Sequence, residues 1–335
     1  MNGERYRAAA PVRLDLAGGW TDVAPFAERE GGVVVNAAIE LLAQAEVEPG
    51  GAGYSVQADD LDRSLELTAA ELSADPGGDL ALHRAALRCA ALGPCRLRTR
   101  SGVPPGSGLG SSGALGVALV AATDAARGVR RPPAAQAEAA FELEALEAGL
   151  PGGRQDQYAA AHGGFHRLGF AAGSVAVQPL SLDAAFAAAL RDHTVVCYTG
   201  RSRVSSNTIS RVMGAYQRGE RDVGDALRRM VELAERIAEA LVAADLAQVG
   251  RLLSENWRQQ QRLDRAMRSD EMARLEDALG GSGILGGKAA GAGAGGSMFF
   301  LARHPAEARR AACEAGCRVL EFDWATAGVR QESGA

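Results

Sequence analysis

The chain has 335 residues, of which 47% are hydrophobic and 23% are charged, and its formal net charge is −5. A chain of this length and composition buries one large core or two medium ones, and we expect two domains. Charges of both signs are mixed along the sequence, which argues against a nucleic-acid partner. No apolar run approaches the roughly 20 residues that span a membrane, and no secretion signal precedes the first charged residues, so we expect a cytoplasmic protein without membrane contact.

The five cysteines are scattered and odd in number, which indicates reduced thiols rather than a disulfide framework. Cys313 and Cys317 are four residues apart, but no histidine or further cysteine nearby completes a zinc pattern. We therefore expect no metal site there.

The first half of the chain is predicted to contain mainly short strands with a few helices. Short apolar runs separated by turns indicate strands at residues 12–17, 32–39, 41–47, 54–58, 65–67, 95–100, 165–170 and 174–179. Helices are predicted at 81–92, 113–126 and 134–148, the last of which ends before Gly149 and Pro151.

The second half is predicted to be an α/β sandwich. A buried strand at 194–198 is followed by helices with apolar spacing at 227–241, 249–265 and 267–279, then by a strand at 297–302, a helix at 305–316 and a strand at 318–322. We place the domain boundary near residue 188, so that residues 1–188 form one domain and residues 189–335 the other.

A glycine loop, residues 104–113, runs straight into the predicted helix 113–126. Four glycines in ten residues let the backbone approach a ligand closely, and the helix that follows directs free N–H groups and its positive dipole end at an anion. Ser111 and Ser112 place hydroxyls where a nucleotide phosphate or its magnesium ion would lie. The plainer alternative is a glycine-rich turn capped by serine.

Two further segments carry candidate functional groups. Residues 286–296 are also rich in glycine and include Lys288, the sole lysine of the sequence, whose compact ammonium suits a phosphate or another ligand oxygen. The alternative is that Lys288 occurs at this position by chance and has no binding role. Residues 151–158 form a tight turn that brings Asp156 to the start of a helix, where it either acts chemically or simply caps the helix.

Glu144 is placed on the apolar stripe of the predicted helix 134–148. Ala137, Phe141, Glu144 and Ala148 follow helical spacing, so the carboxylate faces inward with them. A carboxylate that is buried without a partner costs free energy, so a neighbouring group must balance its charge. Either a magnesium ion shared with nucleotide phosphates or a structural ion pair does this, and the sequence leaves both open.

Together these segments resemble the GHMP small-molecule kinases. The first motif, residues 10–22 (APVRLDLAGGWTD), aligns without gaps with the APGRVNLIGEHTD of galactokinases; the second motif is the glycine loop, close to PxGxGLGSSA; the third motif is residues 286–296. The resemblance implies an α+β two-domain GHMP kinase fold, with an N-terminal ribosomal-protein-S5-like nucleotide-binding domain and a C-terminal ferredoxin-like α/β sandwich. A P-loop is excluded because no GxxxxGK[ST] occurs.

Within the family, the sequence is most similar to kinases that act on the anomeric hydroxyl of a sugar. Residues 17–22 and 35–40 look like the kinase domain of fucokinases, whereas residues 153–160 and 286–288 look more like D-glycero-D-manno-heptose 7-phosphate kinases, which we favour. Gly19 and Trp20 replace the glutamate and histidine of galactokinases, which argues against galactose. Ala294 stands where relatives usually have glycine.

The resemblance also implies roles for individual residues. Asp156 and Arg13 are the expected catalytic residues, Asp156 as the group that accepts or orients the proton of the sugar hydroxyl and Arg13 as a cation beside it. Ser112 and Glu144 are expected to hold Mg²⁺, with Ser111 as an alternative to Ser112. ATP is expected on Pro105, Gly106, Ser107, Gly108, Leu109, Gly110, Ser111, Ser112 and Gly113. The sugar or sugar-phosphate substrate is expected on Gly19, Trp20, Thr21, Asp22, Arg203, Lys288, Gly291 and Gly293.

Several alternatives remain at this level. Lys288 and Arg203 would bind a phosphate already present on the acceptor, but Arg201 or Arg154 would serve equally well. A kinase for a cyclitol or an unusual sugar of secondary metabolism is one alternative function, and a catalytically inactive sugar sensor is another. The oligomeric state does not follow from the sequence.

Overall fold

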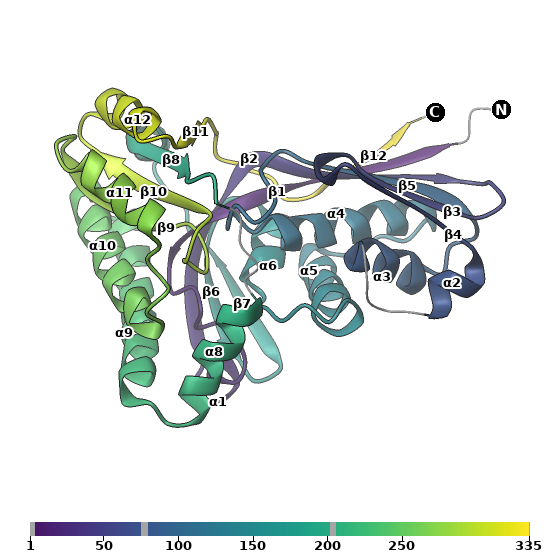
Figure 1. Cartoon of the computed structure of the whole chain (residues 1–335), viewed down its shortest axis with the longest axis horizontal. Coiled ribbons are helices and arrows are strands. Elements are labelled where there is room, and N and C mark those ends of the chain that lie inside the picture. The colour runs from purple at the N-terminus through teal and green to yellow at the C-terminus, as the bar shows by residue number, and fades with distance from the viewer. Residues whose placement is uncertain (1–3, 75–79, 202–205, 335) are drawn as a thin grey trace.

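The computed structural model describes residues 4–74, 80–201 and 206–334, and in these residues two sheets form the framework of the molecule (Figure 1). Arg203, one of the predicted substrate residues, lies outside the described residues.

The first sheet has eight strands among the described residues, in the order β12-β1-β2-β5-β3-β4, with β6 and β7 attached to β2. The strands are β1 (Arg5–Ala17), β2 (Gly32–Pro49), β3 (Tyr54–Ala58), β4 (Arg63–Leu67), β5 (Cys95–Ser101), β6 (Phe165–Ala171), β7 (Ser174–Pro179) and β12 (Arg330–Gly334). β2 is long enough to pair with β6 through residues 32–37 and with β5 through residues 43–49.

Helices cover one face of this sheet (Figure 1). They are α2 (Ala69–Ala74), α3 (Ala81–Ala90), α4 (Ser111–Ala126), α5 (Pro133–Glu142) and α6 (Gln155–His162), and the short α1 (Phe26–Arg29) precedes β2. α4 is apolar on nearly all sides because it is enclosed between β1 and β2 and the neighbouring helices. This burial holds the start of α4 in a fixed position beside β1.

The second sheet has four antiparallel strands in the order β11-β8-β10-β9. They are β8 (Thr194–Tyr198), β9 (Ile284–Ala289), β10 (Ser297–Ala302) and β11 (Arg318–Leu320). In chain order this is the 4-1-3-2 arrangement, which confirms the predicted ferredoxin-like α/β sandwich. The sequence prediction missed β9, which contains Gly286 and Gly287.

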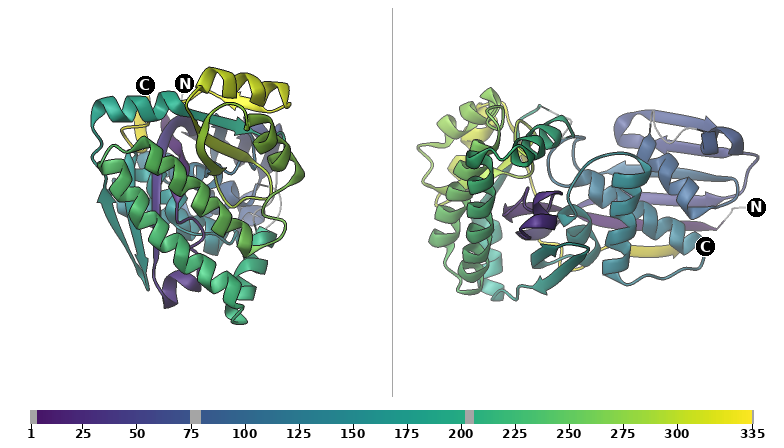
Figure 2. Two further views of the ribbon diagram at one scale, coloured as in Figure 1. Left: turned by 90° about the vertical axis from the view of Figure 1, so that its left-hand side faces the viewer. Right: turned by 90° about the horizontal axis from the view of Figure 1, so that it is seen from below.

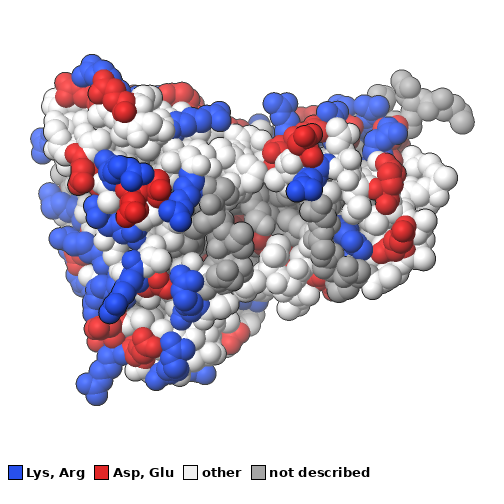
Figure 3. All heavy atoms as spheres, in the orientation of Figure 1, with Lys and Arg blue, Asp and Glu red and all other residues white. Residues whose placement is uncertain are grey.

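The helices of the second half are α7 (Ala184–His193), α8 (Ser206–Gln217), α9 (Arg221–Val242), α10 (Leu246–Leu263), α11 (Asp270–Leu279) and α12 (Pro305–Glu314). Figure 2 shows α9 and α10 side by side, and both also pack against β1 or β2 of the first sheet. On the face drawn in Figure 3, acidic and basic side chains are intermingled.

Two features of the structure bear on the division of the chain into domains. The expected boundary at residue 188 falls inside α7, and the chain returns to the first sheet near its end, where β12 pairs with β1. Trp324 begins this return: its ring lies 4.8 Å from the ring of Phe165, and its indole N–H donates to the Ala187 carbonyl at 2.9 Å. The segment after β11 is therefore packed against the N-terminal half of the chain.

We expect Trp324→Ala to lower the free energy of unfolding by about 2–4 kcal/mol, because it removes a partly buried ring that joins the two parts of the chain. Trp324→Phe keeps an aromatic ring and loses only the N–H bond, so about 1 kcal/mol is expected. Denaturant unfolding measures both. Equal stability of the Trp324→Ala variant and the wild type would contradict this role.

Candidate active site

A cavity of about 310 Å³ is lined by residues from all three motifs. The end of β1 and the loop after it form one wall, and the glycine loop with the first turn of α4 forms another. Residues 150–153 and 155–157, at and before the start of α6, contribute a third part, and Gly291 with Ala292, which follow β9, a fourth; Glu144 and Ile209 also line the cavity. Segments far apart in the sequence thus converge on one cavity.

The glycine loop presents backbone to this cavity. Gly106, Gly108 and Gly110 line it and have φ between +68° and +77°, and Ser111 and Ser112 follow in the first turn of α4. Gly110 is the N-cap of α4, and no side chain caps the helix there. The free N–H groups at the start of α4 and the positive end of its dipole therefore favour an anion at this point.

Four of the predicted nucleotide residues do not line the cavity: Pro105, Ser107, Leu109 and Gly113. Leu109 is part of the hydrophobic core, and its carbonyl accepts from the Arg13 backbone N–H at 2.9 Å. Ser107 is fully buried, and its carbonyl accepts from the Ser297 N–H at 2.7 Å. A Cβ at Gly113 would lie 2.6 Å from the Asp156 Cβ. Leu109, Ser107 and Gly113 thus pack against the rest of the fold, and the prediction that these four residues contact ATP stays a prediction.

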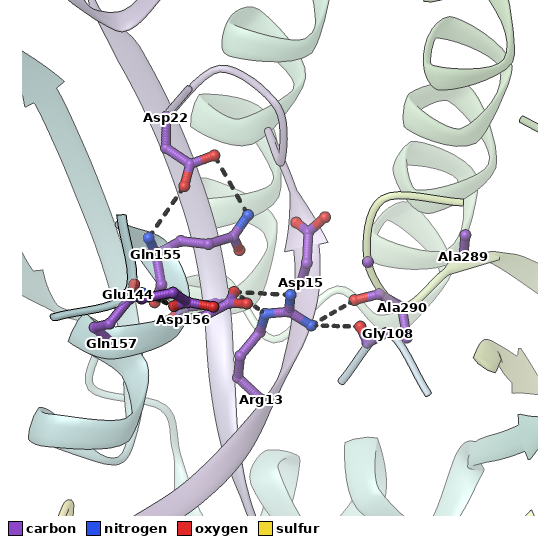
Figure 4. Close-up of polar contacts among 12 residues, drawn as sticks. Arg13, Asp15, Asp22, Gly108, Glu144, Gln155, Asp156, Gln157, Ala289 and Ala290 are labelled. Atoms are coloured by element: carbon purple, nitrogen blue, oxygen red, sulfur yellow. Dashed lines mark hydrogen bonds and ion pairs between the residues drawn. The ribbon is translucent and has the colours of Figure 1, made fainter. Parts of the chain in front are cut away.

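Arg13 and Asp156, which both line the cavity, form an ion pair in which Arg13 is buried and Asp156 is partly exposed (Figure 4). The Arg13 Nε and Nη2 both lie 2.8 Å from the Asp156 Oδ1. The third nitrogen, Nη1, donates to the carbonyls of Gly108 and Ala290, each at 2.8 Å. Arg13 is thereby fixed against the second and third motifs, and Asp156 keeps its Oδ2 for another partner.

Glu144 reaches the cavity from an irregular turn. α5 ends at Glu142, and residues 143–147 form a π-turn instead of the continuous helix predicted over 134–148. Gln157 donates to the Glu144 Oε2 at 2.6 Å, and Ser112 also hydrogen-bonds to this carboxylate. Burial raises the pKa of Glu144 to about 7, and the negative charge of Asp156 adds to this, whereas the two hydrogen bonds act against it. Among the described residues no cation pairs with Glu144, so the structural ion pair is not found.

Asp22 also lines the cavity, and it contacts the first residue of α6. Its carboxylate accepts from the Gln155 backbone N–H at 3.0 Å and lies 3.5 Å from the Gln155 side-chain nitrogen. Burial raises its pKa to about 6, against the effect of the backbone hydrogen bond, and the charges of Asp156 and Asp15 raise it further. Gly19 and Trp20 also line the cavity, and the Trp20 indole N–H has no hydrogen-bond partner in the described structure.

Three predicted substrate residues lie elsewhere. The Thr21 hydroxyl donates to the Gly18 carbonyl at 2.7 Å and accepts from the Val33 N–H at 3.1 Å, so it holds the loop in place. Lys288 is fully buried and uses its three protons on the Asp15 carbonyl, the Asp15 carboxylate and the Ala289 carbonyl. Gly293 packs against Met267, whereas Gly291 does line the cavity. The prediction that Lys288 binds a phosphate directly is therefore wrong.

Asp15, Gln155 and Gln157 line the cavity but were absent from the predicted site. Asp15 stands in the first motif two residues after Arg13, which on a strand places both side chains on the same face. That spacing is a signal that the sequence analysis did not use.

Comparison with known proteins identifies the family. Residues 80–164 match the GHMP kinases N terminal domain, and residues 237–321 match the GHMP kinases C terminal domain. The chain is 30% identical over 302 residues to the D-glycero-alpha-D-manno-heptose 7-phosphate kinase of Campylobacter jejuni, with 88% of each protein covered. The chain belongs to the GHMP kinase family. It is therefore a phosphotransferase that uses an alcohol group as acceptor.

Other relatives agree with this assignment. A solved structure of a D-glycero-D-manno-heptose 1-phosphate kinase from Bacteroides thetaiotaomicron has a TM-score of 0.80 and 26% identity, covering 98% of this chain and 99% of that one. The bifunctional fucokinase/GDP-fucose pyrophosphorylase of Arabidopsis thaliana is 26% identical over 91% of this chain. This GHMP kinase spans only 30% of that longer protein.

None of the helices in the described residues is both long and apolar enough to cross a membrane. No group of three or more histidine, cysteine, aspartate or glutamate side chains in the same residues is arranged to hold a metal ion.

The raised pKa of Asp22 generates a stability prediction. Between about pH 4 and pH 6 the folded state keeps a proton that the unfolded state, with an ordinary pKa of 3.8, has lost. The free energy of unfolding therefore falls as the pH rises through this window. Above pH 6 the buried Asp22 carboxylate is ionised, and it lowers the free energy of unfolding by its full amount.

We expect the free energy of unfolding of Asp22→Asn at pH 7.5 to be larger than that of the wild type by about 1–3 kcal/mol. A shift of one pKa unit corresponds to about 1.4 kcal/mol. At pH 4 the difference should largely disappear. Denaturant titrations of both proteins at the two pH values measure it. A difference that does not change with pH would contradict the assignment to this carboxylate.

Proposed function

We propose that this GHMP kinase transfers the γ-phosphoryl group of ATP to the anomeric hydroxyl of a sugar or sugar phosphate, with a heptose 7-phosphate as the preferred acceptor. The observation that carries the proposal is the Arg13–Asp156 pair, which lies beside the uncapped start of α4 and the glycine loop. A proton-accepting carboxylate and an anion site thus share one cavity.

The nucleotide is assigned to the glycine-loop side of the cavity. The backbone of Gly106, Gly108 and Gly110 and the first turn of α4 would bind the phosphates through N–H groups. Phosphoryl transfer depends mainly on positioning and on neutralising charge, and these fixed donors do both.

The Asp156 Oδ2 would accept the proton of the acceptor hydroxyl as the new P–O bond forms. Arg13 holds the carboxylate in place through Oδ1 and adds a positive charge beside the transferring group. Because the Arg13 guanidinium also bonds to Gly108, it keeps the catalytic carboxylate in register with the nucleotide loop.

The residues present fit a magnesium ion. The Glu144 carboxylate and the Ser112 hydroxyl lie together at the start of α4, and the negative charge of Asp156 adds to that of Glu144. A divalent cation would neutralise this surplus and the charge of the ATP phosphates, taking its remaining ligands from those phosphates and from water. Ser111 also lines the cavity and remains the alternative hydroxyl ligand.

The choice of acceptor is supported by the relatives. The heptose 7-phosphate kinase of C. jejuni matches this chain over 88% of both proteins, whereas the fucokinase of A. thaliana is matched over 30% of its length. In the described lining of the cavity, Arg13 is the sole cation, and Arg154 and Arg201 pair with Glu138 and Glu271. A fucose-type free sugar is therefore retained as the second candidate, and a cyclitol is the third.

The proposal is tested by measuring ADP release with a panel of acceptors: D-glycero-D-manno-heptose 7-phosphate, the free heptose, L-fucose, D-galactose and a cyclitol. Phosphorus NMR of the product shows whether the new phosphate is on the anomeric oxygen. Turnover of the heptose 7-phosphate far above the others supports the proposal. Preferred turnover of L-fucose or of a cyclitol would replace it with the corresponding alternative.

Asp156→Asn is expected to lower kcat by about 100-fold or more, because the amide cannot accept the proton. The affinity for ATP should change less than threefold, since Asp156 acts on the acceptor and not on the nucleotide. Steady-state kinetics and calorimetry of ATP binding provide the two measurements. A variant with most of the wild-type rate would remove Asp156 from the mechanism.

Glu144→Gln is expected to raise the magnesium concentration required for half-maximal rate by about tenfold, because it replaces a charged ligand with a neutral one. Glu142→Gln, at an exposed position two residues earlier, is the matched control and should leave that concentration unchanged. Magnesium titrations at saturating ATP compare the three proteins. If Glu144→Gln changes only thermal stability, Glu144 has a structural role.

A further inference from the structure

The buried carboxylate of Asp15 has one oxygen that the protein itself leaves unused. Asp15 is 1% exposed, lies on β1 two residues after Arg13 and lines the cavity. Its Oδ2 accepts from the Lys288 ammonium at 2.9 Å, but its Oδ1 has no hydrogen-bond partner in the described structure. An unpaired acceptor on a buried charge is costly unless a ligand or water completes it.

Lys288 provides the charge that makes this carboxylate tolerable. The ammonium is fully buried, and besides the Asp15 side chain it binds the Asp15 and Ala289 carbonyls. Burial lowers the pKa of Lys288, and the charge of Asp15 opposes that change. All three Lys288 protons are thus directed at β1 and β9 and away from the cavity, and the Asp15 Oδ1 is left as the free atom of the pair.

The loop after β1 is shaped around this carboxylate. A Cβ at Gly19 would lie 2.1 Å from the Asp15 Oδ2, so any side chain at position 19 would displace it. The next residue, Trp20, also lines the cavity and has a second buried polar atom without a partner in the described structure, its indole N–H. One free acceptor and one free donor therefore lie close together in the chain.

Asp15 lies near a second carboxylate of the cavity, that of Asp22. In Figure 4 the carboxylates of Asp15 and Asp22 and the side chain of Gln155 lie on the same side of the Arg13–Asp156 pair. Asp15 is near enough to Asp22 for its charge to raise the pKa of Asp22. Two carboxylates on one wall suit a molecule with several hydroxyl groups, because each hydroxyl can donate to one of them.

We propose that Asp15 is an acceptor-binding residue: its Oδ1 accepts a hydrogen bond from a hydroxyl of the polyhydroxylated acceptor other than the reacting one, while Lys288 holds the carboxylate in position. The Trp20 N–H donates to a neighbouring oxygen of the same molecule. The inference rests on the proposed function and adds to it that specificity depends on a pair that spans the first and third motifs.

Kinetics of Asp15→Asn test the proposal, with the acceptor that the wild type turns over best in the panel above. We expect the KM for the acceptor to rise at least tenfold, because a charged acceptor is replaced by a neutral one, and the KM for ATP to stay within twofold. Asp192→Asn, at an exposed position on α7, is the control and should change neither.

A double variant, Asp15→Asn with Lys288→Met, removes the unpaired ammonium that Asp15→Asn leaves buried, and so keeps the test valid if the single variant unfolds. We expect it to regain thermal stability while the acceptor KM stays raised. Gly19→Ala, which pushes on the carboxylate without changing any charge, should raise the same KM. Monodeoxy analogues of the acceptor locate the contact: removal of one hydroxyl should weaken binding to the wild type tenfold and to the double variant hardly at all.

The outcomes are distinguishable. A wild type that releases no ADP with any member of the panel contradicts the proposed function and this inference with it. An active wild type together with an unchanged acceptor KM in Asp15→Asn, or a double variant that regains both stability and the wild-type KM, contradicts the inference alone, because Asp15 and Lys288 would then be only a structural ion pair.

Discussion

The guanidinium of Arg13 is the contact on which the arrangement of the site depends. It bonds to the Asp156 carboxylate, to the Gly108 carbonyl and to the Ala290 carbonyl, and thus to one segment from each of three distant parts of the chain. Only a planar group with several N–H donors in a fixed geometry reaches all three at once, which an ammonium does not. The Asp156 carboxylate, the glycine loop and the segment after β9 are placed relative to one another by this one side chain.

The cavity carries more negative charge than the protein neutralises. Asp22 and Glu144 both have a raised pKa, mainly because they are buried, and Asp156 adds its charge to both. Such an arrangement costs stability in the free protein. The proposed magnesium ion and hydroxyl-bearing acceptor would relieve that cost.

Local sequence pattern selected several residues that the structure brings together. Part of the glycine loop at the start of α4, Asp156 at the start of α6 and Arg13 on β1 line one cavity, and their roles there stay predictions. Lys288 was misassigned because a lone lysine in a glycine segment looks like a ligand group, and its partner Asp15 is 273 residues away in the sequence. Only the tertiary structure shows that the two meet.

Elements stabilised by distant contacts were likewise missed. β9 contains Gly286 and Gly287, which lack strand propensity; at Gly286 a side chain would lie 1.7 Å from the Gly250 carbonyl oxygen, so glycine is needed for α10 to pack on this strand. The turn at residues 143–147 departs from the helical pattern of its sequence, and β12 is a polar segment that becomes a strand only because β1 offers it an edge.

The pairing of β12 with β1 has a consequence for biosynthesis. β1 is among the first elements to leave the ribosome. β12, the strand that covers its outer edge, is made after all the other strands and helices that the structure describes. Until then β1 exposes a row of unpaired backbone groups, the kind of edge through which nascent chains aggregate. The N-terminal domain thus reaches its complete form only after translation has passed through the whole C-terminal domain, which makes folding of the two halves interdependent in time as well as in space.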